Sequence, residues 1–217
     1  MPTDCGAPST TGGSCLPGSD AVAAGAYSSC MERTPVLAIC GSLRHDSLHR
    51  GLLTAVAERA PQLQFVGADL VRDLPLFDPD LDLPERLPAV AREFRLVAEA
   101  SQAAVIASPE YLYAPSGITK NALDWLAGST GLLGKPVLML SASPGETGGM
   151  RGIAGLIPTL IALDADLVDP VTISHATGRI SSDGRVFDVG LDLRLEIAVE
   201  QLRERMAHSS STITALG

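Results

Sequence analysis

The amino-acid sequence predicts one doubly wound α/β domain built around a parallel sheet. Short apolar runs without polar alternation recur along the chain, as is typical of strands that are buried on both faces. Segments with helical spacing of apolar residues separate these runs, and crossovers of this length imply right-handed connections between parallel strands. The 217 residues, 46% hydrophobic and 19% charged, are enough for one such domain and few for two.

The first half of the domain alternates strand and helix. The continuous apolar run Val36–Cys40 predicts the first strand. Apolar residues recur at helical spacing from Ser47 to Arg59, and a second strand is expected over Leu63–Leu70. A second helix is expected over Pro88–Ala100, and Ala103–Ala107 predicts the third strand.

The second half continues this alternation. A short helix is expected near Lys120–Leu126, a fourth strand over Val137–Leu140 and a helix over residues 149–163. A fifth strand is expected over Leu167–Ile173 and a last helix over Asp192–Ala207. The helix at 149–163 contains residues that weaken or kink a helix: Gly152, Gly155 and Pro158. Five parallel strands with these crossovers fit the strand order 2-1-3-4-5.

Both ends of the chain are expected to be disordered tails. Twenty-one of the first thirty residues are Gly, Ser, Thr, Pro or Ala, which cannot form a packed core. We therefore expect an N-terminal tail over residues 1–33, a folded domain over 34–207 and a C-terminal tail over 208–217. Met31 is a usable start, so the first thirty residues are expected to be dispensable.

Charge, apolar content and cysteine pattern exclude several classes of function. The net charge of −9 argues against non-specific nucleic-acid binding, which needs a basic face. No apolar run reaches the roughly 18 residues of a membrane span, and no secretory signal is recognised, so a cytoplasmic location is expected. Cys5, Cys15 and Cys30 form no CxxC pair, which predicts neither a disulfide framework nor a metal site. Cys40 is expected to be a small buried hydrophobe.

Three polar, glycine-containing loops follow the first, third and fourth strands. They comprise residues 41–47, 108–117 and 141–149. In the order 2-1-3-4-5 these strands are neighbours, so the loops are expected to meet at one crevice. Ligands of such sheets bind outside the carboxyl ends of the strands, where the strand order reverses.

The first loop has the composition of a phosphate site. Gly41 permits a tight turn, and Ser42, Ser47 and the amides that open the next helix can donate to phosphate oxygens. Arg44 offers a planar fork that matches phosphate, and His49 could donate from the first helical turn. The alternative is a capped helix start with a surface arginine. The loop is neither a Walker loop nor a Rossmann glycine motif.

The second and third loops suit a planar heterocycle. Tyr111 and Tyr113 could stack on or edge a ring, and the alternative is that they are packing residues. Glu110 is either an acid or base or, as we favour, a cap for a nearby backbone amide. The segment 143–149 contains three glycines that could present amides to a ring edge, and the alternative is a mobile surface loop.

No side chain is nominated as catalytic or metal-binding. The histidines lie at positions 45, 49, 175 and 208, and none forms a Ser-His-Asp set or a cluster with metal-ligand spacing. His175 follows the fifth strand and is expected at the surface.

Four ordered motifs resemble the NAD(P)H-dependent FMN reductase family, which includes quinone, azo-dye and chromate reductases. The motifs are Gly41-Ser-Leu-Arg-x-x-Ser47, Ala107-Ser-Pro-Glu-Tyr111, Gly117-x-x-Lys-Asn-Ala-x-Asp-Trp125 and Gly134-Lys-Pro-Val through Ala142-Ser-Pro-Gly-x-x-Gly-Gly149. The similarity extends over roughly residues 34–205. It implies a flavodoxin-like, five-stranded parallel sheet of order 2-1-3-4-5.

The resemblance also implies a set of cofactor-binding residues. Those that would hold the FMN phosphate are Ser42, Arg44, Ser47, Leu48 and His49. Those that would line the isoalloxazine and ribityl chain are Pro109, Glu110, Tyr111, Leu112 and Tyr113. Those that would close over the polar edge of the ring are Ser143, Gly145 and Gly148. The family usually has Asn in place of His49 and of Leu112, and its Ile-Pro-Gly reads Pro115-Ser-Gly117 here.

The function implied by the resemblance is hydride transfer from NAD(P)H, the co-substrate, through FMN to a quinone, azo, flavin or similar small-molecule acceptor. The reductase either keeps FMN bound or releases it reduced, and NADH and NADPH are both open. The alternatives are a non-enzymatic flavodoxin-like electron carrier and a flavin-binding sensor. Arg44 argues against a carrier, whose phosphate loop is usually rich in Ser and Thr without an arginine.

The family commonly forms dimers or tetramers, and the segment Ile118–Leu133 is a candidate for such an interface. It contains more apolar residues than a short helix needs for its own packing. These residues are Leu123, Trp125, Leu126, Leu132 and Leu133. A homodimer or homotetramer is therefore expected, with core packing as the alternative for Trp125.

Overall fold

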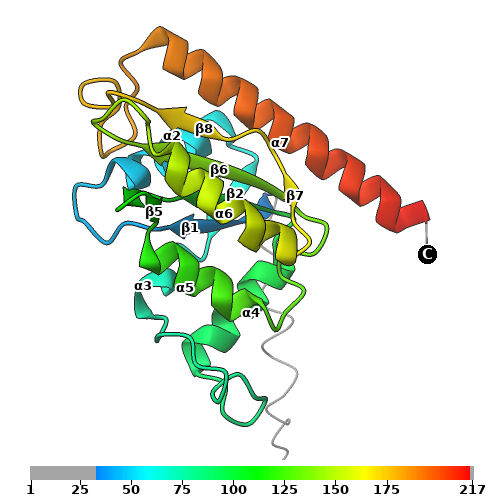
Figure 1. Cartoon of the computed structure of the whole chain (residues 1–217). Coiled ribbons are helices and arrows are strands. Elements are labelled where there is room, and N and C mark those ends of the chain that lie inside the picture. Colours follow the sequence, from blue (N-terminus) through cyan, green and yellow to red (C-terminus); the bar gives the residue numbers. More distant parts are fainter. Residues whose placement is uncertain (1–32, 216–217) are drawn as a thin grey trace, which may run out of the picture. The chain divides into compact units, whose positions relative to one another are not determined.

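A computed structural model describes residues 33–215 of the chain, and its centre is a parallel β-sheet (Figure 1). The strand order is β2-β1-β3-β6, and the short strands β7 and β8 both pair with β6. The strands are β1 (Thr34–Cys40), β2 (Leu63–Val66), β3 (Ala103–Ala107), β6 (Pro136–Ala142), β7 (Asp166–Leu167) and β8 (Val171–Ile173). The expected flavodoxin-like fold class and strand order are confirmed.

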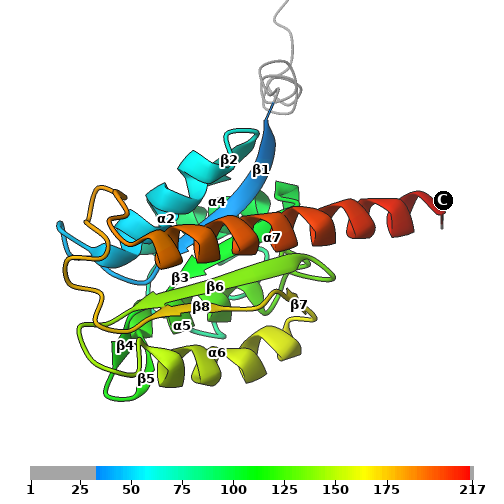
Figure 2. The same ribbon diagram turned by 90° about the horizontal axis from the view of Figure 1, so that it is seen from above.

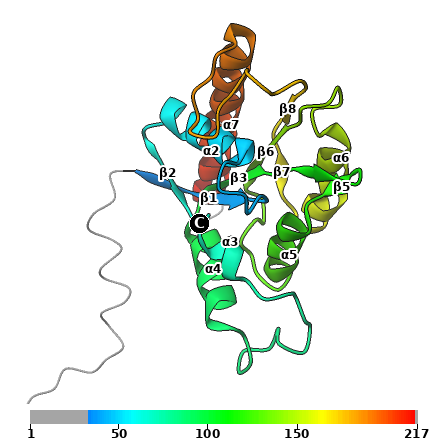
Figure 3. The ribbon, with the colours of Figure 1, turned by 90° about the vertical axis from the view of Figure 1, so that its left-hand side faces the viewer.

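Helices cover both faces of this sheet (Figure 3). The helices are α2 (Leu48–Arg59), α3 (Leu70–Asp73), α4 (Ala89–Ala100), α5 (Gly117–Leu126), α6 (Met150–Ala162) and α7 (Val189–Ala215). Helices α2 and α7 pack on one face, and α4, α5 and α6 pack on the other. The period of two along a strand explains this division, since Val36 and Ala38 face the first pair while Leu37 and Ile39 face the second group. Fully buried parallel strands need apolar residues on both faces, as β1 has.

The second strand is shorter than expected, and the fifth is divided. Strand β2 ends at Val66 because Gly67 turns the chain with a φ of 86°. The expected fifth strand is interrupted between β7 and β8, where Pro170 has no amide hydrogen to donate to a ladder. Both short strands remain parallel to β6.

The last helix is longer than expected at both ends. Asp188 Oδ1 accepts a hydrogen bond from the Leu191 amide at 2.7 Å and so caps the first turn of α7. The helix then continues to Ala215 instead of ending near Ala207, because no Gly or Pro lies between Ala207 and Ala215 to stop it. The C-terminal tail expected over 208–217 is therefore helical for most of its length. The end of α7 extends past the strands (Figure 2).

A small hairpin and one short helix were missed by sequence reasoning. Strands β4 (Glu110–Tyr111) and β5 (Ala114–Pro115) pair antiparallel between β3 and α5. Helix α3 follows β2 directly. The expected N-terminal tail, apart from residue 33, lies outside the described residues. Among the described helices, none is long and apolar enough to cross a membrane.

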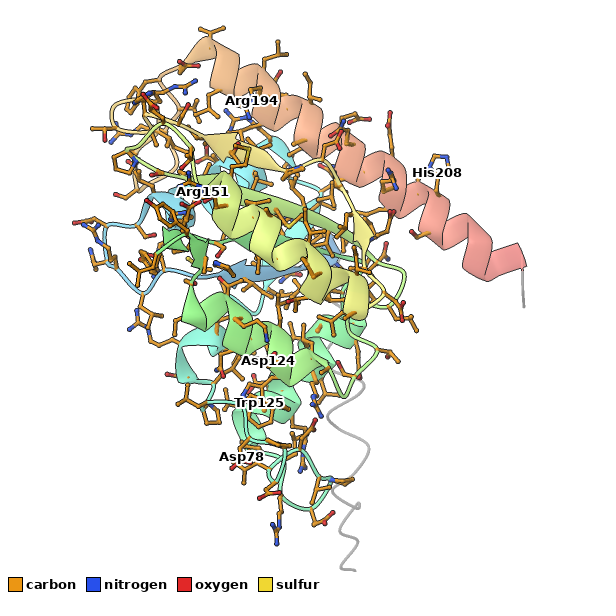
Figure 4. The ribbon with its side chains drawn as sticks, in the orientation of Figure 1. Asp78, Asp124, Trp125, Arg151, Arg194 and His208 are labelled. Carbon is orange, nitrogen blue, oxygen red and sulfur yellow. The ribbon has the colours of Figure 1, made fainter. Side chains whose placement is uncertain are left out.

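The residues expected at a dimer surface are mostly part of the core. Trp125 is fully buried, and its Nε1 donates to the carbonyl oxygen of Pro75 at 2.8 Å (Figure 4). Its ring also packs edge-on against Phe77, with centroids 5.1 Å apart. Within the expected apolar set only Leu133 is exposed. The apolar content of this segment therefore serves the monomer core, and the argument for a dimer from it was wrong.

Candidate functional site

The three polar loops meet at the carboxyl ends of β1, β3 and β6. The Gly41 amide donates to the Ala107 carbonyl at 2.8 Å, and the Ser108 amide donates to the Leu140 carbonyl at 3.0 Å. A Cβ atom on Gly41 would lie 2.7 Å from Ser116 Oγ, so only glycine permits this close approach. The expected convergence of the loops is therefore present. It brings the three loops together at the edge of the sheet where the strand order reverses, and this junction is called the crevice.

The loop after β1 has the features of an anion site. Ser47 caps α2, because its Oγ accepts from the His49 amide at 3.2 Å, and the Ser47 hydroxyl hydrogen can still donate. Within the described part of the chain, the amides of Ser42, Leu43 and Arg44 have no hydrogen-bond partner. The Arg44 side chain is exposed beside them. Unpaired loop amides, the N-terminus of α2 that follows them and a guanidinium together fit a phosphate group.

An arginine from another element supports this loop. Arg72 on α3 donates from Nη2 to the Leu43 carbonyl at 3.2 Å. Sequence reasoning missed this contact, because α3 itself was not expected. Leu48 is half-buried at the start of α2, and Ser42 is buried below the loop.

His49 lies in the interior of the site, not on its surface. Its side chain is 6% exposed, and its Nε2 accepts from the Ala142 amide at 3.3 Å. Burial lowers the pKa of His49 to about 4, while a hydrogen bond with the Ser108 backbone opposes that shift. The ring is therefore neutral near pH 7. The sequence-based expectation that His49 donates outward to a phosphate is not supported by this orientation.

Buried hydroxyl groups connect the second and third loops beneath the crevice. Thr119 Oγ1 donates to Ser108 Oγ at 3.0 Å and lies 2.9 Å from Ser116 Oγ. Ser141 Oγ donates to the Ser108 carbonyl at 2.7 Å. All four side chains are buried and hydrogen-bonded, which gives the loops a fixed polar base.

The tip of the β4–β5 hairpin is apolar and has an unusual backbone. Leu112 and Tyr113 have φ values of 51° and 64°, in the left-handed region that favours Gly or Asn. The Leu112 side chain is 98% exposed, and Tyr111 and Tyr113 are also exposed. The hairpin therefore presents flat and apolar groups to solvent beside the crevice.

Glu110 and Arg151 fix the hairpin to helix α6. The Glu110 carboxylate accepts from the amides of Arg151 at 2.9 Å and Gly152 at 3.1 Å, so the favoured capping role is confirmed. The Arg151 guanidinium carbon, from the residue labelled in Figure 4, lies 4.3 Å from the centroid of the Tyr113 ring, as in a cation–π contact. Pro109 is buried at the base of the hairpin.

The third loop is anchored by backbone contacts. The Ser143 amide donates to the Ile173 carbonyl at 3.0 Å, and Ser143 Oγ accepts from the Gly145 amide at 3.1 Å. A Cβ on Gly148 would lie 2.7 Å from the Ser174 nitrogen, so packing against the end of β8 requires glycine there. Gly145 is exposed and Gly148 is buried. These contacts connect the third loop to the end of β8.

A protein-family model matches most of the folded domain. The chain matches the model described as NADPH-dependent FMN reductase over residues 34–178. This range contains all three loops of the crevice and the hairpin.

Curated relatives have corresponding names. The chain is 30% identical over 178 residues to a quinone reductase of Escherichia coli, covering 70% of this chain and 95% of that protein. It is 33% identical over 172 residues to an NAD(P)H-dependent FMN reductase of Pseudomonas aeruginosa, covering 77% of this chain and 91% of the relative.

A solved structure has the same fold and a sequence similar to that of this chain. The flavoenzyme NAD(P)H:(acceptor) oxidoreductase FerB from Paracoccus denitrificans superposes with a TM-score of 0.72 at 27% identity. The match covers 81% of this chain and 98% of that one.

Proposed function

The chain belongs to the NADPH-dependent FMN reductase family, and on that premise we propose that it reduces a quinone or a similar planar small molecule. Membership makes it an NAD(P)H-dependent oxidoreductase with FMN as cofactor. The observation that carries the proposal is the convergence of three loops on one crevice that combines unpaired amides, an exposed arginine and exposed aromatic rings.

In this proposal the loop after β1 holds the FMN phosphate. Ser42 and Ser47 donate from their hydroxyl groups, the amides beside Leu48 point along the axis of α2, and Arg44 supplies a charge-assisted pair. Supporting this role, the amides of Ser42 to Arg44 lack partners in the described part of the chain.

The hairpin and the third loop would enclose the isoalloxazine ring. Pro109 and Glu110 give the hairpin its rigid base, while Tyr111, Leu112 and Tyr113 offer the surface on which a ring could rest. The third loop would present backbone amides from Ser143, Gly145 and Gly148. When bound, FMN would supply the redox chemistry by accepting a hydride from NAD(P)H and passing electrons onward. The protein supplies position and electrostatics, and no general base is assigned.

The exposed apolar tip of the hairpin favours a planar organic acceptor. Relatives named quinone reductases point in the same direction. The alternative is a non-enzymatic FMN electron carrier, which would bind FMN but turn over NAD(P)H slowly.

Steady-state oxidation of NADH and NADPH by the FMN-loaded chain tests this function. We expect oxidation to accelerate at least tenfold when menadione is added, with saturation in both substrates. The same assay with FMN alone, without protein, is the control. A chain that binds FMN yet shows no protein-dependent oxidation with quinone, azo or flavin acceptors would be a carrier or sensor instead.

We also propose that the chain forms a homodimer or homotetramer and that residues 1–30 are dispensable for FMN binding. The exposed tyrosines and Leu112 at the hairpin support a protein contact near the crevice, whereas the segment 118–133 does not. Light scattering of the full chain tests the oligomer, and titration of a version beginning at Met31 with FMN tests the second idea. A 22.5 kDa particle, the mass of one chain, would contradict the oligomer. The cytoplasmic location stays a prediction.

A further inference from the structure

His49 lies at the junction of all three loops. It belongs to the first turn of α2, and its amide donates to the cap residue Ser47 of the first loop. Its ring reaches the Ser108 backbone at the start of the second loop and the Ala142 amide at the start of the third. One side chain therefore contacts each segment that would surround the cofactor.

These contacts define the protonation state of the ring. Because the Ala142 N–H donates to Nε2, that nitrogen must carry a lone pair, and the hydrogen of a neutral ring then resides on Nδ1. This tautomer can donate from Nδ1 to the Ser108 carbonyl, which also accepts from Ser141 Oγ. A protonated ring would place two N–H groups against each other at Ala142.

We propose that His49 is a positioning residue of the cofactor site, whose neutral ring sets the spacing of the three loops without touching FMN. The proposal rests on the proposed function, because it assigns the loops to FMN. The sequence predicted that His49 contacts the phosphate. In this proposal its side chain instead connects the segments at the carboxyl ends of β1, β3 and β6.

The surroundings of His49 agree with an uncharged link. The ring faces backbone groups of Ser108 and Ala142, and the charged side chains of its own loop and turn, Arg44, Asp46 and Arg50, are exposed. Cys40, at the end of β1, is buried, and burial raises the pKa of its thiol. Glu110 is engaged with the amides of α6. Burial is the main cause of the lowered pKa of His49.

The first test follows the protonation of His49 by ¹H–¹⁵N imidazole NMR on the parent chain, with and without FMN, between pH 5 and 8. We expect His49 signals of the Nδ1–H tautomer that do not titrate in either state. A His49 that becomes protonated when FMN binds would show contact with the phosphate and overturn the proposal.

The second test compares two variants at pH 7 with FMN and riboflavin as ligands. His49→Gln keeps an acceptor of similar reach and is expected to bind both flavins within about threefold of the parent. His49→Leu removes the acceptor and is expected to weaken both flavins by at least fivefold and to a similar degree. Riboflavin lacks the phosphate, so it reports on the loops alone.

Three outcomes contradict the proposal: unchanged binding by His49→Leu, a loss confined to FMN, or a loss in His49→Gln equal to that in His49→Leu. If His49→Leu does not fold, the NMR titration and the His49→Gln variant still decide. A parent chain that binds no flavin would instead refute the proposed function, whereas a parent that binds FMN but fails these tests refutes only the role of His49.

Discussion

The carboxylate of Glu110 accepts a hydrogen bond from the amide of Gly152 at 3.1 Å, which joins the hairpin after β3 to the start of α6. Gly152 allows this approach, since a Cβ atom there would lie 3.2 Å from the Glu110 Cβ. Gly155, one turn later, meets Pro115 in the same way, with its Cβ position 2.9 Å from Pro115 Cδ. The two glycines that seemed only to weaken α6 in the sequence thus form the surface on which the hairpin packs.

Replacing Glu110 by Gln should destabilise the protein by about 1 kcal/mol. Gln keeps an acceptor but removes the negative charge at the helix N-terminus, where Gly149 provides no side-chain cap. Urea unfolding measures the change. Glu146→Gln, an exposed carboxylate of the neighbouring loop, is the matched control and should change stability by less than about 0.5 kcal/mol. Equal effects of the two substitutions would contradict the capping role.

Replacing Leu112 by Asn should stabilise the protein by roughly 0.5–1 kcal/mol, because Leu112 has a φ of 51° that Asn adopts more readily. Its side chain is 98% exposed in the single chain, so little packing within the chain is lost. The control is Leu112→Ala, which removes the same exposed side chain without adding the Asn amide. We expect no comparable gain in stability for this variant. Thermal unfolding measures both. If Ala stabilises as much as Asn, loss of an exposed apolar group and not backbone strain is the cause.

The layout of the sheet could be predicted because its central strands carry the signal in their own residues. Two strands, Val36–Cys40 and Ala103–Ala107, contain no polar residue. A strand needs apolar residues at every position only when both of its faces are buried. The convergence of the loops then followed from strand order. The hairpin could not be predicted, because Leu112 and Tyr113 are not turn residues and their conformation depends on contacts with α6.

The roles of single side chains were harder to predict than the site itself. The sequence places His49 in a phosphate motif, but burial and the Ala142 amide direct its ring inward. In the sequence, Trp125 and its neighbours are more apolar residues than a short helix is expected to bury. In the structure, the indole is buried, donates to the Pro75 carbonyl and packs against Phe77. These outcomes depend on residues distant in the chain, which local patterns do not report.

The stability of the protein should decrease as the pH falls from 6.5 towards 4, because His49 is uncharged when folded. An unfolded His49 binds a proton near pH 6.5, whereas the folded group does so only near its pKa of about 4. In this window the unfolded state binds more protons, which lowers the free energy of unfolding as the pH falls. Between pH 7 and 4.5 the contribution is roughly 2 kcal/mol.

Urea unfolding of the parent and of His49→Gln at several pH values isolates this contribution. Other titrating groups affect both proteins alike, so the difference between their curves reports on His49. We expect the parent to lose more stability than the variant on acidification. Parallel curves would mean that His49 has the same pKa in the folded and unfolded chains.

Titration of the parent and of Arg44→Ala with FMN and riboflavin shows whether the loop after β1 binds FMN through its phosphate. Arg86→Ala, an exposed arginine before α4, is the matched control and should bind both flavins as the parent does. Arg44→Ala is predicted to weaken FMN by about ten- to a hundredfold, equivalent to roughly 1.5–3 kcal/mol, and to leave riboflavin nearly unchanged. Raised salt should weaken FMN more in the parent than in Arg44→Ala, since an exposed ion pair is screened. Identical binding of FMN by the parent and Arg44→Ala, or an equal loss for both flavins, would contradict the account.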